Sequence, residues 1–147
     1  MTAQELEAYL HENIPVTRAM EVVALEVAPK NITLGAPLAP NTNHRNTAFG
    51  GSVSTLATLA AWSLLRISLG DDARDVHLVI QRNNMEYLRP ITGFFTATAF
   101  LSPATDWEKF LLALSKRGRG RLSIEALVEF DGKTCARFEG DFVALVQ

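Results

Sequence analysis

The chain has 147 residues, of which 48% are hydrophobic and 20% charged, and its formal net charge is −2. This composition excludes a disordered chain, and the slight negative charge gives no general attraction to nucleic acid. The length predicts a single domain over residues 1–147 with a sizeable core. Cys135 is the only cysteine, which excludes an intrachain disulfide and a cysteine-based zinc site.

The first residues, Met1 to Glu5, are acidic and lack the charged and apolar regions of a signal peptide. Together with the single cysteine, this favours a reducing cytoplasm as the location of the protein. The three histidines, His11, His44 and His77, are scattered along the chain. We therefore expect no metal site.

The first predicted elements are a short helix and a β-hairpin. Residues 2–12 fit a helix because Thr2 and Glu5 have the spacing of a capping box. Residues 20–28 and 32–38 are rich in β-branched side chains and are separated by a Pro-Lys-Asn turn. They are predicted to pair as the first hairpin.

A polar loop at residues 39–49 is predicted to lead directly into the central helix of the fold. Residues 51–69 form an almost uninterrupted apolar run, and Gly70 supplies the stop signal. The sequence Gly50-Gly51-Ser52 at the start of this run indicates a sharp turn into the helix, at which Ser52 or Thr47 would cap the free N–H groups. A lone buried helix with such a start is also a ready site for an anion or oxyanion.

The same apolar run is long enough to suggest a membrane span. We expect no span, because the run is interrupted by Arg66 and by six hydroxyl side chains, those of Ser52, Ser54, Thr55, Thr58, Ser63 and Ser68. A helix of roughly 28 Å that is hydrophobic nearly all round must be covered by other elements. The strands predicted for the rest of the chain are the elements that would wrap it.

A turn at Asp71-Asp72, two strands and a short helix are predicted after Gly70. Residues 76–88 read as a strand that ends before Pro90, and residues 94–101 are expected to pair back on it as the next strand. Residues 106–116 are predicted to form a short helix capped by Asp106.

The clearest pattern in the chain is a hairpin near the C-terminus. Apolar residues alternate with polar ones from 122 to 130, Asp131-Gly132 provides a tight turn, and apolar residues return from 136 to 144. About six antiparallel strands and one long buried helix therefore predict an α+β domain in which the sheet curls over the helix.

Two motifs resemble a known family. The segment Met85 to Gly93, placed between a long helix and an antiparallel meander, resembles the hotdog fold of acyl-thioester enzymes. Residues 36–43, Ala-Pro-Leu-Ala-Pro-Asn-Thr-Asn, followed by Phe49-Gly-Gly-Ser, are similar to the YiiD C-terminal family of thioesterase-like proteins. This resemblance covers essentially the whole chain. It implies a homodimer or higher homo-oligomer and a substrate carried by coenzyme A or acyl carrier protein, with no separate cofactor.

The candidate catalytic residues are Asn43, Gly51, Ser52 and Thr58. In many hotdog thioesterases an Asp or Glu stands two turns past the glycines, and this chain has Thr58 there and no carboxylate between Gly51 and Leu69. Asn43 either donates its amide to a thioester oxygen, as the family motif favours, or bonds its own loop. Thr58 either holds a water or bonds the helix backbone.

Other residues are candidates for substrate binding or proton transfer. The helix start supplies Thr47, Phe49, Gly50 and Ser54 as candidate substrate-binding residues. His44 is either a general base or an exposed loop residue. The basic stretch with Lys116, Arg117, Arg119 and Arg121 is either a solvated loop or a docking patch for the phosphate of a pantetheine arm or for acidic carrier protein.

Three functions follow from these motifs. The first is hydrolysis of an acyl-CoA or acyl carrier protein thioester. The second, an activity that the resemblance also implies, is decarboxylation of malonyl carrier protein to acetyl carrier protein in fatty acid synthesis, which needs no base on the helix. The third is a non-catalytic module that binds acyl groups or a partner.

Overall fold

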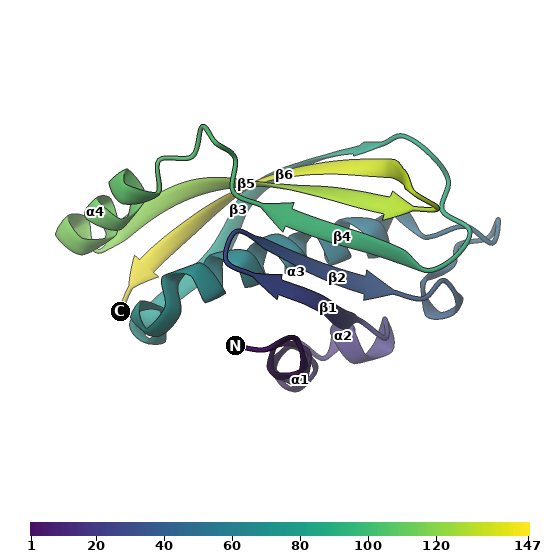
Figure 1. Ribbon diagram of the computed structural model, residues 1–147, viewed down its shortest axis with the longest axis horizontal. Coiled ribbons are helices and arrows are strands. Elements are labelled where there is room, and N and C mark those ends of the chain that lie inside the picture. The colour runs from purple at the N-terminus through teal and green to yellow at the C-terminus, as the bar shows by residue number, and fades with distance from the viewer.

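The computed structural model describes residues 1–147, except for the side chain of Asp72. A six-stranded antiparallel sheet with strand order β1-β2-β4-β5-β6-β3 curls around helix α3, Gly50–Leu69 (Figure 1). The strands are β1 (Val23–Ala28), β2 (Asn31–Ala36), β3 (Val76–Tyr87), β4 (Phe95–Phe100), β5 (Arg119–Phe130) and β6 (Lys133–Val146). The other helices are α1 (Ala3–Asn13), α2 (Val16–Ala19), α4 (Trp107–Arg117) and the 3₁₀ turns η1 (Ala39–Asn41) and η2 (Gly70–Asp75).

Helix α3 forms the centre of the hydrophobic core. Its alanines at 57, 60 and 61 are buried, as are Ala97 and Ala99 on β4, so the helix and the sheet approach closely. Among the described helices, α3 alone is long and apolar enough to cross a membrane, and 56% of its most apolar stretch is buried inside the structure. The sheet that covers α3 accounts for this apolar composition, and Gly70 ends the helix with a positive φ of 60°.

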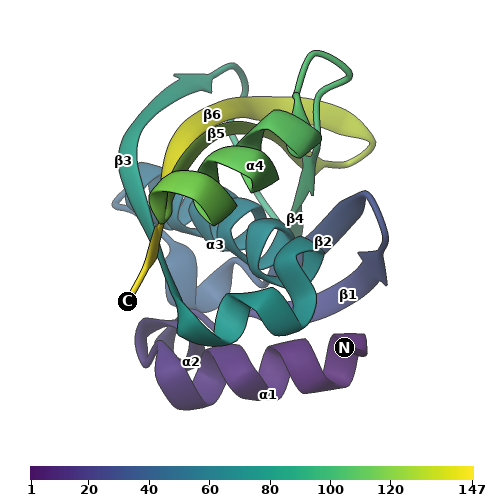
Figure 2. The same ribbon diagram turned by 90° about the vertical axis from the view of Figure 1, so that its left-hand side faces the viewer.

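Helix α1 closes the side of α3 that the sheet leaves open (Figure 2). The predicted capping box is present, since the Thr2 hydroxyl accepts from the Glu5 amide and the Glu5 carboxylate accepts from the Thr2 amide. The Tyr9 ring stacks on Trp62 of α3, and the guanidinium of Arg66 lies 4.6 Å from the centre of the Tyr9 ring. The single charge on α3 is therefore covered by aromatic rings.

The predicted pairing of the strand at residues 94–101 with the strand at residues 76–88 is wrong. Strand β4 pairs with β2 and β5, whereas β3 pairs with β6 and lies at the edge of the sheet. The connection between β3 and β4 is the reason. The amides of Leu88 and Arg89 donate to the Cys135 carbonyl on β6, and Gly93 lies against Phe130 of β5. The connection from β3 therefore passes the ends of β6 and β5, and β4 is added on the far side of these two strands instead of beside β3.

Two other predicted boundaries differ from the structure. The first strand begins at Val23 and not at residue 20, because the chain makes the short helix α2 and then passes through Glu21, whose φ is 55°. The turn expected after Gly70 is the longer 3₁₀ segment η2. Both hairpins, β1–β2 and β5–β6, and the Asp106 cap of α4 are confirmed.

Truncating one core side chain of α3 tests its central role. Leu56 is 0% exposed, so Leu56→Ala is expected to lower the free energy of unfolding by roughly 3–5 kcal/mol, because it leaves a cavity. Leu112 on α4 is 54% exposed, and Leu112→Ala should cost less than about 0.5 kcal/mol. Urea unfolding of both variants provides the measurement. Equal costs would show that α3 is not the centre of the core.

Candidate functional site

The N-terminus of helix α3 is not capped by a side chain. Phe49 occupies the N-cap position, with φ −61° and ψ 132°, and its side chain makes no capping bond. The predicted cap by Ser52 or Thr47 is therefore wrong. Ser52 already lies inside the first turn, and the Thr47 hydroxyl accepts a hydrogen bond from Nδ2 of Asn43 at 2.8 Å.

The uncapped start leaves three backbone donors free. Among the described residues, no carbonyl or side chain accepts from the N–H groups of Gly50, Gly51 and Ser52. The first bond of the helix runs from the Val53 amide to the Phe49 carbonyl at 3.1 Å. The free N–H groups lie at the positive end of the helix dipole and can bind a negatively charged oxygen.

Backbone bonds hold the loop that precedes the helix. The Phe49 amide donates to the Asn41 carbonyl at 2.7 Å, and the Ala48 amide donates to the Ile91 carbonyl at 2.9 Å. Asn41 is 2% exposed, and its Nδ2 donates to the carbonyls of Met20 and Pro37. Asn41 is thus a structural anchor beneath the site.

Asn43 closes the projecting turn of the same loop. Its Oδ1 accepts from the amides of Arg45 and Thr47, at 2.8 and 3.2 Å, and its Nδ2 donates to the Thr47 hydroxyl. These bonds are the local ones weighed in the sequence analysis, and they leave one Nδ2 hydrogen of Asn43 free. His44 is exposed on this turn, and no hydrogen bond to its ring is present among the described residues.

The hydroxyl groups of Ser54 and Thr58 donate to the helix itself. Oγ of Ser54 bonds the Gly51 carbonyl at 3.1 Å, and Oγ1 of Thr58 bonds the Ser54 carbonyl at 2.8 Å. Their hydrogens are therefore occupied, and only oxygen lone pairs remain to hold a water.

A cavity of about 340 Å³ opens beside the helix start. It is lined by Ala48, Gly50 and Val53, by residues 87–91, and by Cys135 and Ala136. Arg89 is the one charged residue of this lining, which contains no carboxylate and no histidine. Tyr87 and Arg89 were not among the predicted site residues, although both lie in the segment Met85 to Gly93 that carries the family resemblance. Their position beside Gly50 depends on where β3 ends in the sheet.

The basic segment lies at the other end of the sheet (Figure 1). In the sheet, Arg119 of β5 pairs with Leu145 of β6, and Leu145 pairs with His77 near the start of β3. The helix start instead contacts Tyr87, at the end of β3. Ten residues of strand separate the two places by about 30 Å. Within one protomer, the exposed Arg117, Arg119 and Arg121 do not reach the helix start.

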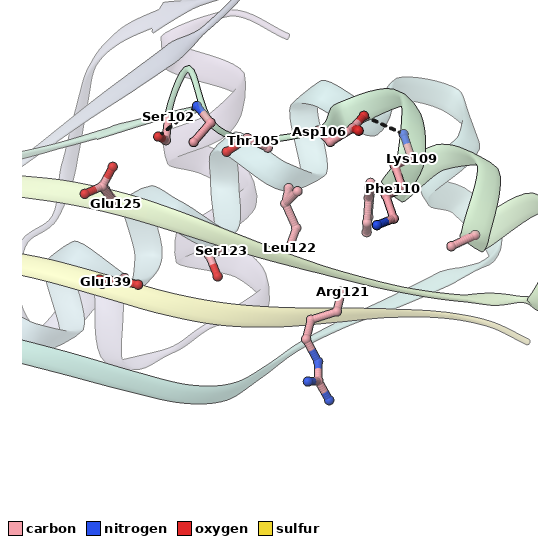
Figure 3. Close-up of a pocket in the computed structure, with 12 residues that line it drawn as sticks. Ser102, Thr105, Asp106, Lys109, Phe110, Arg121, Leu122, Ser123, Glu125 and Glu139 are labelled. Carbon is pink, nitrogen blue, oxygen red and sulfur yellow. Dashed lines mark hydrogen bonds between the residues drawn. The ribbon is translucent and has the colours of Figure 1, made fainter.

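A groove of about 550 Å³ adjoins the basic segment between α4 and the outer face of β5 and β6 (Figure 3). Its lining mixes Lys109 and Arg121 with Asp106, Glu125 and Glu139. Figure 3 shows the Arg121 side chain directed away from Ser102 and Thr105 across the groove. The groove is therefore of mixed charge and is not a continuous basic patch.

Known proteins are similar to this chain in sequence and fold over nearly its whole length. The sequence profile of the family described as "Putative thioesterase (yiiD_Cterm)" matches residues 3–146. A solved structure described as a putative thioesterase from Shewanella oneidensis is 29% identical, with 97% of this chain and 96% of that chain covered and a TM-score of 0.84. A Chlorobaculum tepidum protein of unknown function is 25% identical over 99% of this chain and 94% of its own, with a TM-score of 0.87.

A third structure, from Pseudomonas aeruginosa and described as a probable thioesterase, is 23% identical and has a TM-score of 0.82. It covers 98% of this chain and 96% of its own, and at this identity it shows the fold alone. The expected hotdog fold, an antiparallel sheet wrapped around one long helix, is confirmed.

Proposed function

Because the chain belongs to the YiiD C-terminal family of thioesterases, we propose that it acts on acyl thioesters whose carbonyl oxygen binds at the start of helix α3. The observation that carries this proposal is the set of free N–H groups on Gly50, Gly51 and Ser52 beside a cavity. Donors fixed in this way stabilise the charge that develops on a thioester oxygen. The thiol carrier would be coenzyme A or the phosphopantetheine of acyl carrier protein.

Hydrolysis is the reaction that the family membership favours. A water attacks the thioester carbon, the carbonyl electron pair moves to oxygen, and the oxyanion accepts from the Gly51 and Ser52 amides. When the intermediate collapses, the C–S bond breaks and the sulfur takes a proton, so the products are a carboxylic acid and a free thiol. The oxygens of Ser54 and Thr58 would hold the water, and His44 is the nearest histidine in sequence for its proton.

Decarboxylation of a malonyl thioester is the second candidate, and the cavity lining favours it. The lining has no carboxylate or histidine to act as a base, and it has one cation, Arg89, to hold a substrate carboxylate. When the bond to that carboxylate breaks, carbon dioxide leaves and the electron pair becomes an enolate on the thioester oxygen. The enolate carbon then takes a proton from water, which gives the acetyl thioester.

Product analysis separates these reactions. The protein is incubated with malonyl and long-acyl forms of coenzyme A and of acyl carrier protein, and thiol and acyl products are measured. Release of free thiol identifies a hydrolase, and conversion of malonyl to acetyl thioester without thiol release identifies a decarboxylase. We expect one of these results. Neither product from any substrate would contradict the proposal and favour a non-catalytic binding module.

Two substitutions at Asn43 test whether its free Nδ2 hydrogen reaches the substrate. If it does, Asn43→Ala should lower kcat by about 10²–10³-fold, equivalent to about 2.7–4 kcal/mol of transition-state stabilisation. Asn43→Asp retains an oxygen for the amides of Arg45 and Thr47 but loses the donor, so it should be equally slow. An active Asn43→Asp variant would restrict Asn43 to shaping its loop.

We also propose that the protein works as a homodimer joined along β3. This strand has one free edge, and its exposed apolar residues include Val79, at 47%, and Ile80, at 36%. Antiparallel pairing of two β3 strands places the start of one beside the end of the other. Arg119 and Arg121 of the second copy would then lie on the side of the first copy's helix start.

Charge reversal tests the docking role of the basic segment. The double variant Arg119→Glu and Arg121→Glu should raise KM for a carrier-bound substrate more than it lowers kcat, and the effect should shrink at high salt. The control, Arg18→Glu with Lys30→Glu, makes the same change of net charge at exposed positions away from β3. An unchanged KM at low salt, or a stable monomer by light scattering, would contradict this docking arrangement.

A further inference from the structure

Each of the two glycines at the helix start has an aromatic ring on the side where a Cβ would lie. Ring atoms Cε1 and Cζ of Tyr87 lie 3.5 and 3.6 Å from the place that a Cβ would occupy on Gly50. On the next residue, the same place on Gly51 is only 2.3 Å from Cε2 of Phe49. The ring of Phe49 therefore occupies the space of a missing side chain on Gly51, and the ring of Tyr87 faces Gly50 across a space that a Cβ would fill.

The hydroxyl of Tyr87 donates a hydrogen bond to the Gly50 carbonyl at 3.1 Å. This carbonyl and the N–H of Gly51 belong to one peptide unit. Because that unit is planar and trans, its C=O and N–H point in opposite directions. A bond that fixes the carbonyl oxygen of Gly50 therefore also fixes the direction of the Gly51 N–H group.

Within the helix, the Gly50 carbonyl accepts the backbone bond from the Ser54 amide, and the Tyr87 hydroxyl is its second donor. Both residues of this peptide unit are glycines, whose backbone is the least restricted of any residue, and no side chain caps the first turn. The backbone of Tyr87 is held at the end of β3. It is opposite Ala136 in the sheet, and the next two amides, those of Leu88 and Arg89, donate to the Cys135 carbonyl at 2.8 and 3.1 Å.

We propose that Tyr87 is a positioning residue that aims the Gly51 N–H at the reacting oxygen by holding the other end of the same peptide. This inference rests on the proposed function, because it assigns a role within the same oxyanion site. The hydroxyl of Tyr87 is hydrogen-bonded to the Gly50 carbonyl and so acts through the backbone. Its contribution should therefore appear in the rate of the chemical step more than in substrate binding.

The decisive variant is Tyr87→Phe, which keeps the ring and removes the hydroxyl. We expect kcat to fall about tenfold while KM stays unchanged, as for the loss of one orienting hydrogen bond. The matched control is Tyr9→Phe, which removes the hydroxyl of the other tyrosine, on α1. It should leave kcat and KM at their wild-type values.

Backbone dynamics provide a readout independent of turnover. By ¹⁵N relaxation, the order parameter of the Gly51 amide should fall from the rigid range, about 0.85, in Tyr87→Phe and stay high in Tyr9→Phe. Adding Gly50→Ala to Tyr87→Phe should recover part of the lost kcat, because alanine restricts the backbone and its Cβ fits against the ring.

These measurements separate the failure of this inference from the failure of the proposed function. An unchanged kcat in Tyr87→Phe would overturn the positioning role while thioester turnover stands. A fall in kcat matched by a rise in KM and a loss of thermal stability would also overturn it, since Tyr87 would then be purely structural. If the wild-type protein processes no thioester, the proposed function fails, and an unchanged Gly51 amide in Tyr87→Phe would overturn the inference as well.

Discussion

The burial of helix α3 is the constraint on which the rest of this structure depends. A 20-residue helix with a single charge cannot be left open to water, so the sheet must curl around it and α1 must close the remaining side. Alanines on α3 and β4 allow the two backbones to approach closely. This packing fixes the helix along its whole length, and it therefore also fixes the place at which the helix begins.

The helix start is unusual because its polarity is left unused by the protein. A capping side chain commonly satisfies the first N–H groups of a helix, whereas here those of Gly50, Gly51 and Ser52 are free next to a cavity. The loop before them is tied by the carbonyls of Asn41 and Ile91. Rigid surroundings with free donors are what the stabilisation of a developing oxyanion requires.

Elements that depend on local sequence were predicted well. The capping box at Thr2, the stop at Gly70 and the Asp131-Gly132 hairpin each follow from a few neighbouring residues, and the structure contains all three. The pairing of β4 was predicted wrongly because it depends on where a seven-residue connection travels. A strand has no local signal for its partner, since its hydrogen-bonding groups are the same on every strand.

In the candidate site, too, features set by neighbouring residues were predicted better than contacts between distant parts of the chain. The Gly-Gly-Ser turn located the helix start from sequence, but the capping role given to Ser52 and Thr47 was wrong because Asn43 engages the Thr47 hydroxyl. Tyr87, at the end of β3, and Arg89, two residues beyond it, reach this site from a part of the chain that is far away in sequence. The basic segment, which the sequence left as either a solvated loop or a docking patch, lies at the opposite end of the sheet from the helix start.

The cluster of Tyr9, Trp62 and Arg66 has a spectroscopic consequence. Trp62 stacks on Tyr9 of α1 and donates from its indole nitrogen to the Leu78 carbonyl of β3, so its surroundings involve three elements at once. The second tryptophan, Trp107, packs against Phe110 on α4, away from α1. The intrinsic fluorescence of the protein therefore combines the emission of two tryptophans in different surroundings. With Trp107 replaced by phenylalanine, the emission of Trp62 alone would report the detachment of α1 from the core.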